Sequence, residues 1–223
     1  MKLKLNQYFD HTILKADATE ADIKKLCKEA MDHRLFAVCV NSSYVPLAAN
    51  LLANSEVKIA AVVGFPLGAS CTLSKAYETH CACTNGAAEI DMVIQIGALK
   101  EARYDYVRED IEAVVFAAKE QNATVKVILE TCLLSDEEIV KACQLSMEAG
   151  AAFVKTSTGF STGGATAHHV ALMRHTVGTQ MQVKASGGIR DLAKTLEMIE
   201  AGADRIGASA SIDILKEYET NPL

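Results

Sequence analysis

The strongest constraint on the fold of this chain is a pattern that repeats eight times along its 223 residues. Short runs of apolar and β-branched residues alternate with stretches in which apolar residues recur at helical spacing. Strands that alternate with helices in this way form parallel sheets through right-handed crossovers. The expected strands cover residues 9–14, 35–40, 58–63, 89–94, 124–130, 153–156, 182–185 and 204–207.

Eight strand–helix units close most simply into a barrel. We therefore expect an α/β fold, a single-domain (β/α)8 TIM barrel spanning residues 1–223, because no linker or shift of composition interrupts the chain. An open, doubly wound sheet is the alternative. The Gly-x-Gly-x-x-Gly turn that would follow the first strand of such a sheet is missing, which favours the barrel.

Several helix starts carry capping residues. Thr19 with Asp22 and Ser135 with Glu138 have the spacing of capping boxes, and Asp191 is placed to cap a later helix. Further helices are expected over residues 44–52, 73–84, 165–175 and 209–219.

Charge and cysteine content narrow the setting of the protein. The chain has 22 Lys and Arg against 28 Asp and Glu, a net charge of −6, which argues against nucleic acid as a partner. Its longest apolar stretch, residues 59–69, is too short to span a membrane. Seven cysteines without a Cys-x-x-Cys pair indicate free thiols. We expect a cytoplasmic protein without a membrane partner.

Two segments of the chain share a layout. Residues 86–91 and 150–155 each begin Gly-Ala-Ala and enter a strand, and they place Asp91 and Lys155 at the same offset. Strands of the same parity contribute side chains to the same layer of a barrel interior. Asp91 and Lys155 are therefore expected to meet inside the barrel, with Lys184 on the adjacent strand. The alternative is that Gly-Ala is only a common joint between helix and strand.

The fifth strand adds more charge to the interior. Val125, Val127 and Leu129 share the parity expected to face the helices, which leaves Lys126 and Glu130 facing inward. Buried charges are costly unless they are paired. Two interpretations remain open: a self-neutralising structural network, or a site that uses a lysine as a nucleophile.

A lysine attacks a carbonyl only as the neutral amine. At its reference pKa of about 10.4, only about one lysine in two thousand is neutral at pH 7. A second ammonium nearby lowers that pKa, so Lys184 could activate Lys155. Asp91 could then exchange protons as a general acid and base. Two lysines and one carboxylate are the groups that imine and enamine chemistry needs.

Glycine-rich segments follow three consecutive strands. They are Lys155 to Thr166, Ser186 to Gly188, and Gly207 to Ser209. Backbone amides in such loops bind phosphate, and the phosphate site of a barrel often follows its seventh and eighth strands. Each cluster alone can be read as an ordinary turn. Together, beside the lysines, they predict a site for a phosphate group.

Seven motifs follow one another between residue 9 and about residue 210. They are Phe9–Lys15, Val38–Asn41, Val63–Gly68, Glu89–Val93, Val154–Phe160, Val183–Arg190 and Arg205–Ser209. Together these motifs resemble the deoxyribose-phosphate aldolase family.

The resemblance implies a class I aldolase that uses neither a metal nor another cofactor. Such enzymes reversibly cleave 2-deoxy-D-ribose 5-phosphate to D-glyceraldehyde 3-phosphate and acetaldehyde, in the catabolism of deoxyribose phosphate. By similarity, Lys155 would form the Schiff base, and Lys184 would tune its pKa and take part in proton transfer. Asp91 would donate and accept protons, and Asp10 would complete the polar relay.

The resemblance also implies a phosphate site and a homodimer. The phosphate would be held mainly by the backbone amides of Gly159, Gly187, Gly188 and Ser209, and two further residues, Cys39 and Thr156, would lie near the pocket. Many relatives carry Pro where this chain has Ser42, and Asn where it has Gln95. Paired serines are common after the eighth strand, but here Ala210 separates Ser209 from Ser211, which leaves side-chain contacts to phosphate open.

Other functions remain as alternatives. The chain could be a different imine-forming aldolase for a phosphorylated sugar, or a barrel that binds a sugar phosphate without turnover. Cys39 could be a reactive thiol, although a small buried hydrophobic role is favoured. Metal binding by His80 with Cys81 and Cys83 lacks a second ligand pair. The sequential His168 and His169 are expected to point apart on a helix.

Overall fold

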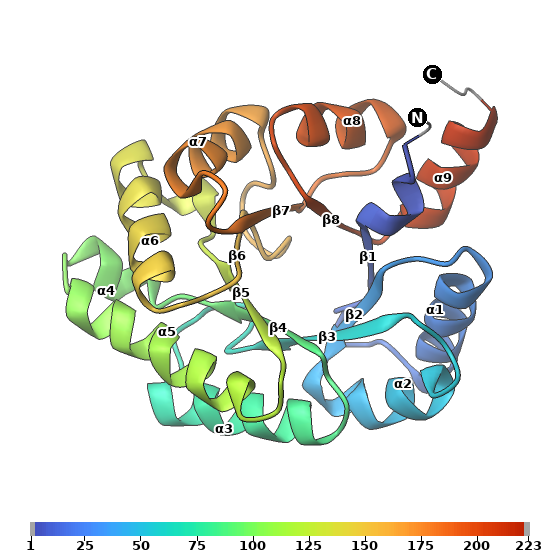
Figure 1. Cartoon of the computed structure of the whole chain (residues 1–223), viewed down its shortest axis with the longest axis horizontal. Coiled ribbons are helices and arrows are strands. Elements are labelled where there is room, and N and C mark those ends of the chain that lie inside the picture. The colour runs from blue at the N-terminus through green and yellow to red at the C-terminus, as the bar shows by residue number, and fades with distance from the viewer. Residues whose placement is uncertain (1–2, 221–223) are drawn as a thin grey trace.

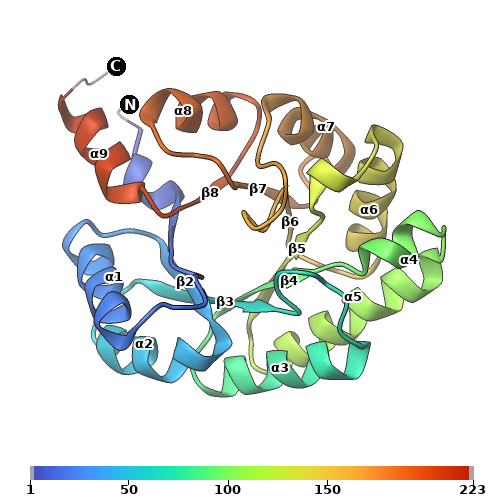
Figure 2. The same cartoon turned by 180° about the vertical axis from the view of Figure 1, so that it is seen from behind.

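The computed structural model describes residues 3–220 and has a closed barrel of eight parallel strands inside a ring of helices (Figure 1). Each strand pairs with the next in sequence, and β8 (Arg205–Ala208) pairs with β1 (Phe9–Thr12) to close the barrel. The view from behind shows the same ring of helices (Figure 2). The expected (β/α)8 barrel is confirmed, and the open sheet is excluded. The expected range of 1–223 includes residues 1–2 and 221–223, which lie outside the described part.

The remaining strands lie close to the predicted ranges. They are β2 (Ala37–Asn41), β3 (Lys58–Val63), β4 (Glu89–Val93), β5 (Thr124–Ile128), β6 (Phe153–Lys155) and β7 (Gln182–Ser186).

The helices cover the outside of the barrel. They are α1 (Glu20–Asp32), α2 (Val45–Leu52), α3 (Thr72–Thr84), α4 (Ile96–Lys100), α5 (Tyr104–Lys119), α6 (Asp136–Glu148), α7 (Ala167–Val177), α8 (Leu192–Glu200) and α9 (Ser211–Thr220). Three short 3-10 helices are η1 (Leu5–Tyr8), η2 (Ser42–Tyr44) and η3 (Thr131–Leu133). None of the helices described has the length and apolarity needed to cross a membrane.

The predicted helix caps are present. Thr19 and Ser135 form capping boxes with Asp22 and Glu138, and the side chain of Asp191 accepts from the amide of Lys194. These contacts satisfy amides that have no partner within the first turn of a helix. They fix where α1, α6 and α8 begin.

The largest departure from the expected elements follows β5. The strand was predicted to reach residue 130, but it ends at Ile128, and Glu130 adopts a left-handed backbone with φ 57° that leads into η3. The apolar alternation through Leu129 gave no sign of this turn. The short helix α4 was not predicted, and α7 begins two residues later than expected.

The core has two parts. Val125, Val127 and Leu129 belong to the large apolar cluster between strands and helices, as their parity predicted. A small separate cluster of Leu14, Cys39, Ala60, Val62 and Phe65 has its buried members on or beside the first three strands. Other inward positions of the strands carry the charged groups described below.

A buried ion pair joins helices outside the barrel. Lys75 of α3 donates to Asp110 of α5 at 2.5 Å and to the Val93 carbonyl at 3.0 Å. The Thr72 hydroxyl donates to the same carboxylate at 2.8 Å. Both charged side chains are almost fully buried, so each depends on the other for its stabilisation.

We expect Asp110→Ala to lower the free energy of unfolding by about 3–5 kcal/mol, because it leaves the Lys75 ammonium buried without its partner. Asp105→Ala on the same helix removes an exposed carboxylate and should change stability by less than about 0.5 kcal/mol. Urea unfolding of the parent and both variants measures the difference. Equal effects of the two substitutions would contradict the assignment.

Candidate active site

Charged side chains from six strands converge inside the barrel, and all of them are buried. They are Asp10 of β1, Glu89 and Asp91 of β4, Lys126 of β5, Lys155 of β6, Lys184 of β7 and Arg205 of β8.

Asp91 lies at the centre of this group. One of its carboxylate oxygens, Oδ2, accepts from Lys155 Nζ at 2.8 Å and from Lys184 Nζ at 2.7 Å. The other, Oδ1, accepts from Lys126 Nζ at 2.8 Å. The predicted meeting of Asp91 with Lys155 and Lys184 is therefore present, and Lys126 faces inward as its parity predicted.

Asp10 links Lys184 to a second basic group. Its Oδ2 accepts from Lys184, and its Oδ1 accepts from the Arg205 guanidinium at 2.8 Å. Arg205 also reaches Glu89 at 3.2 Å, and Lys126 forms an ion pair with Glu89. The guanidinium lies 3.5 Å from the centroid of the Phe36 ring, a cation–π contact.

Glu89 and Arg205 were not predicted as members of this group. A signal was available for Glu89, which has the same parity as Asp91 on one strand, whereas the pairing of Arg205 with Lys184 follows from the register of the barrel. Side chains of one parity on a barrel strand share the interior. Both residues extend the buried network beneath the lysines.

The charges in this network do not balance when every group is ionised. Four basic groups, Lys126, Lys155, Lys184 and Arg205, meet three acidic groups, Asp10, Glu89 and Asp91. An uncompensated charge in a buried site is unfavourable. Loss of one proton from a lysine removes the excess positive charge.

The electrostatic environment selects Lys155 for that loss. Burial disfavours its ammonium form, and the nearby Lys184 adds repulsion, so the pKa of Lys155 is lowered although Asp91 attracts the charge. Burial opposes the charge of Lys184 too, but Asp10 and Asp91 prevail and raise the pKa of Lys184. The pKa of Lys155 is therefore below the usual value for a lysine, and the pKa of Lys184 is above it.

The two carboxylates remain charged. Burial alone would raise the pKa of Asp91, but Lys126, Lys155 and Lys184 hold it well below the usual range. Burial also raises the pKa of Asp10, but the nearby cations outweigh it, and Lys184 lowers that pKa the most. Asp91 is thus an ionised carboxylate in direct contact with Lys155, the amine whose pKa is lowered.

A pocket of about 440 Å³ opens above this network. Of the three barrel lysines, only Lys155 lines it, together with the expected Gly159, Gly187, Gly188 and Ser209. Lys184, Asp91 and Asp10 lie behind Lys155. Within the buried network, Lys155 is therefore the lysine that a molecule in the pocket can contact. Lys184, Asp91 and Asp10 can influence that molecule through their contacts with Lys155 and with one another.

Glycine is required where the loops meet at the pocket. Gly159 and Gly188 have φ values of 85° and 77°, which L side chains rarely adopt. A Cβ on Gly164 would lie 2.2 Å from the Gly187 carbonyl oxygen, so the loops after β6 and β7 could not approach as they do. Within residues 3–220, the amides of Gly159 and Gly188 donate to no protein acceptor. They are available to an anion.

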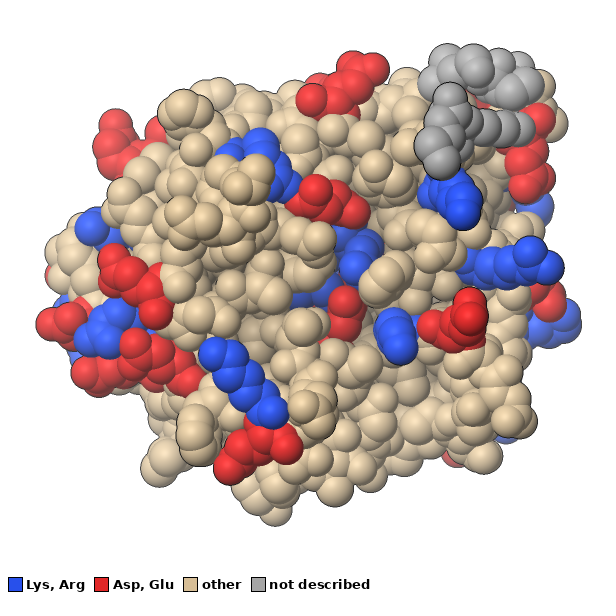
Figure 3. Space-filling view, viewed as in Figure 1, with Lys and Arg blue, Asp and Glu red and all other residues tan. Residues whose placement is uncertain are grey.

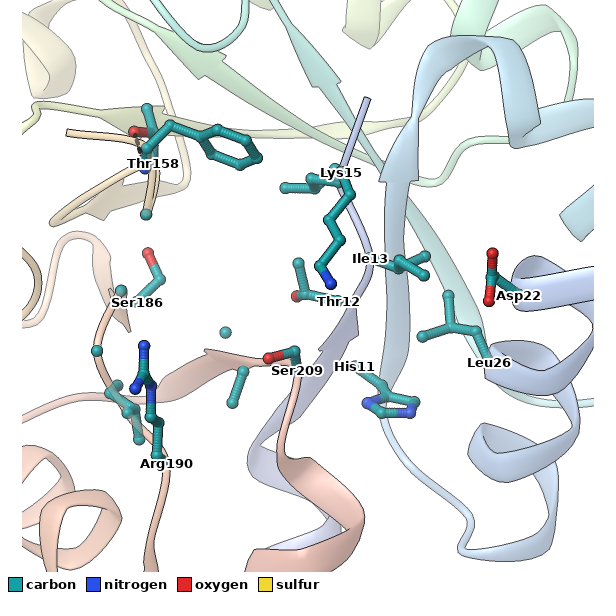
Figure 4. A pocket seen from close by; sticks show the side chains of 18 of the residues that line it. His11, Thr12, Ile13, Lys15, Asp22, Leu26, Thr158, Ser186, Arg190 and Ser209 are labelled. Carbon is teal, nitrogen blue, oxygen red and sulfur yellow. Dashed lines mark hydrogen bonds between the residues drawn. The ribbon is translucent and has the colours of Figure 1, made fainter. Parts of the chain in front are cut away.

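Three cationic side chains that line the pocket, Lys15, Lys25 and Arg190, were not singled out from the sequence. Lys15 and Arg190 extend toward the open space of the pocket from different sides (Figure 4). Basic and acidic side chains also surround a depression near the centre of the face in Figure 3. A pocket that combines free amides with several cationic side chains suits a phosphate group.

Other expected residues lie outside the pocket lining. The Thr156 hydroxyl is buried and bonds both the amide and the carbonyl of Ser186 at 3.1 Å, which ties β6 to β7. Cys39 is buried 4.0 Å from Asp91, and burial raises the pKa of its thiol, which favours the unreactive interpretation. Ser211 donates to the Ala208 carbonyl at 2.9 Å.

Two expectations about individual side chains were wrong. Glu130 was expected to face inward with the charged groups, but the left-handed turn directs its carboxylate to Thr158 of the next loop. His168 and His169 do not point apart: their rings lie 5.5 Å from each other, and Asp136 of α6 lies 2.7 Å from His168 Nε2. The ligand atoms of these three residues lie within 4.8 Å of one another on the surface.

Known proteins resemble this chain along nearly its whole length. The family model described as DeoC/LacD family aldolase matches residues 4–217. Deoxyribose-phosphate aldolases from Clostridium tetani and Carboxydothermus hydrogenoformans are 60% and 59% identical, over 96% of this chain and 99% and 94% of theirs. The solved deoxyribose phosphate aldolase of Aeropyrum pernix, described as a tetramer, superposes with a TM-score of 0.91 at 33% identity, covering 97% of this chain and 91% of its own. The chain belongs to the DeoC/LacD aldolase family.

Proposed function

We propose that this protein is a deoxyribose-phosphate aldolase. It would reversibly cleave 2-deoxy-D-ribose 5-phosphate to D-glyceraldehyde 3-phosphate and acetaldehyde through a Schiff base on Lys155. The observation that carries the proposal is a buried lysine with a lowered pKa, 2.8 Å from a carboxylate, at the wall of a pocket with free loop amides. The names of the relatives support the choice of substrate.

The first half of the reaction forms the imine. The neutral amine of Lys155 adds to the C1 aldehyde of the open-chain sugar phosphate, and the resulting carbinolamine loses water to give an iminium ion. Asp91 contacts Lys155 Nζ, so it can take the proton that the nitrogen gives up and return it to the departing hydroxyl.

The second half breaks the carbon–carbon bond. The C3 hydroxyl loses its proton, directly or through a water, toward Asp91, and the C2–C3 bond breaks. Its electrons move into the iminium to form an enamine, and glyceraldehyde 3-phosphate leaves. The enamine carbon then takes a proton, and water releases acetaldehyde and the free amine.

Lys184 and Asp10 support these steps without lining the pocket. Lys184 bonds both Asp10 and Asp91, so its charge keeps Asp91 ionised and disfavours a proton on Lys155. Asp10 in turn holds Lys184 charged. The lysine that forms the imine and the lysine that activates it are thus separated by a shared carboxylate.

The phosphate would lie against the loops after β6, β7 and β8. The amides of Gly159, Gly187, Gly188 and Ser209 would donate to its oxygens, and Lys15 and Arg190 would supply positive charge. Ser211 is turned toward the Ala208 carbonyl, so the backbone would provide most of the contact on the β8 side.

A barrel that only binds sugar phosphate is the weaker alternative, because binding requires no amine with a lowered pKa.

We further propose a single working domain, a cytoplasmic location and a homodimer. All seven cysteines are free, as a reducing compartment favours. Light scattering during size-exclusion chromatography should give twice the chain mass of 23.9 kDa, and a monomer mass would exclude the dimer.

We expect incubation with acetaldehyde and borohydride to leave a reduced two-carbon adduct on Lys155. The reason is that its amine is the one whose charged form is disfavoured by burial and by Lys184. Peptide mapping by mass spectrometry locates the adduct. Lys155→Ala should lose it together with cleavage of 2-deoxyribose 5-phosphate, whereas Lys119→Ala, at an exposed lysine, should retain both. An adduct spread over surface lysines would reject the proposed nucleophile.

Lys184→Met should move the acid limb of the kcat/KM profile to higher pH. The substitution removes a charge that lowers the pKa of Lys155, so that pKa rises and the neutral amine appears only at higher pH. Loss of the proton relay should also reduce kcat by about a hundredfold or more. Lys184→Arg keeps the charge, so its acid limb should remain near that of the parent even where its rate falls. An unshifted limb in Lys184→Met would show that Lys184 does not tune Lys155.

A further inference from the structure

Glu130 is a buried carboxylate that the proposed chemistry does not use. It follows β5, is 2% exposed, and adopts a left-handed backbone with φ 57°. It forms no ion pair with a basic side chain of residues 3–220. A buried carboxylate without a cation depends on the hydrogen bonds that it accepts. The partners of those hydrogen bonds therefore indicate the role of Glu130 in the fold.

The carboxylate of Glu130 is bound to a single residue of the next loop. It accepts from the Thr158 amide at 3.3 Å and from the Thr158 hydroxyl. That hydroxyl accepts in turn from the Phe160 amide at 3.0 Å. One carboxylate thus fixes both ends of the turn around Gly159, whose φ is 85° and whose own amide remains free.

The same short segment supports the rest of this loop. The Thr131 amide donates to the Thr156 carbonyl at 2.9 Å. Cys132 Sγ lies 3.9 Å from both Glu130 and the Thr162 hydroxyl. The loop after β6 therefore rests on residues 130–132, with Glu130 as its only charged contact there.

The contacts of Glu130 are separate from those that hold Lys155. Lys155 is fixed by Asp91 through its side chain and by the Leu129 amide, which donates to its carbonyl at 2.9 Å. Thr158, Gly159 and Phe160 line the pocket, and the Phe160 ring packs edge-on against Phe65 with 5.3 Å between centroids. A change at Glu130 should therefore move the pocket loop and leave the amine in place.

We propose that Glu130 is a positioning residue that sets the pocket's preference for a phosphorylated substrate. By holding Thr158 and Phe160, it presents the Gly159 amide toward the phosphate without touching the phosphate itself. This inference rests on the proposed function, in which that amide binds phosphate. It assigns Glu130 to substrate selection and leaves imine formation to Lys155.

Glu130→Gln is the main test, with kcat and KM measured on 2-deoxyribose 5-phosphate and on 2-deoxyribose. A glutamine keeps one acceptor but loses the charge, so KM for the phosphorylated sugar should rise about tenfold, the loss expected for a hydrogen bond to a charged group. Values of kcat/KM for 2-deoxyribose, and the rate of acetaldehyde trapping on Lys155, should stay within about twofold of the parent, as for independent sites. Inhibition by inorganic phosphate should weaken in parallel with the rise in KM.

Two further variants complete the test. Glu148→Gln makes the same change at an exposed position of α6 and should leave all values at those of the parent. Thr158→Val removes the hydroxyl that links Glu130 to Phe160 but keeps the Thr158 amide. Its effect should combine with that of Glu130→Gln less than additively, because both act through the same contact. Thr158→Val also carries the test if Glu130→Gln does not fold.

The outcomes separate this inference from the proposed function. Equal losses on both sugars, or no change on either, would overturn the role of Glu130 in phosphate preference. Additive effects of Glu130→Gln and Thr158→Val would overturn the route through Thr158. If the parent protein itself forms no acetaldehyde adduct on Lys155, the proposed function fails instead.

Discussion

The structure depends on an uneven set of charges buried inside a closed barrel. Four basic and three acidic side chains surround the point where Asp91 meets Lys155 and Lys184. The charged groups cannot separate, because the barrel wall fixes each one on its own strand. The network is therefore best satisfied when one amine is neutral. By burying these groups together, the fold favours one neutral amine, as the proposed nucleophile requires.

The position of each lysine decides which amine becomes neutral. Lys184 contacts two carboxylates, Asp10 and Asp91, whereas Lys155 contacts Asp91 alone and lies next to the pocket. Two carboxylates outweigh burial at Lys184, and one does not at Lys155. The difference between the proposed activator and the proposed nucleophile thus comes from one additional ion pair. Asp10 makes that difference although it lies away from the pocket lining.

The sequence predicted the barrel and the central site because both depend on periodic patterns. Strand–helix alternation gave the barrel, and residue parity on β5 placed Lys126 inside and Leu129 outside, as observed. The role of the lysines as a set required the resemblance in addition to these patterns. Parity with Asp91 on one strand places Glu89 inside, whereas the alignment of Arg205 with Lys184 depends on the register of the closed barrel, which the sequence does not contain. The direction of Glu130 could not be predicted, because a left-handed turn by a glutamate breaks the parity on which the prediction relied.

The two ends of the candidate site are built by different means, and this separates reactivity from selection. Lys155, Lys184 and Asp91 lie on neighbouring or nearby strands, where the hydrogen-bonded register of the barrel fixes their spacing. The phosphate end consists of loops whose shape depends on glycines and on side-chain anchors such as Glu130. Loops tolerate substitution better than a closed barrel does. Changes in the anchors can therefore alter which aldehyde or sugar is accepted while the charge balance that activates Lys155 persists. This arrangement explains how one barrel could serve aldolases with different substrates: the amine depends on the strands, and the choice of substrate depends on the loops.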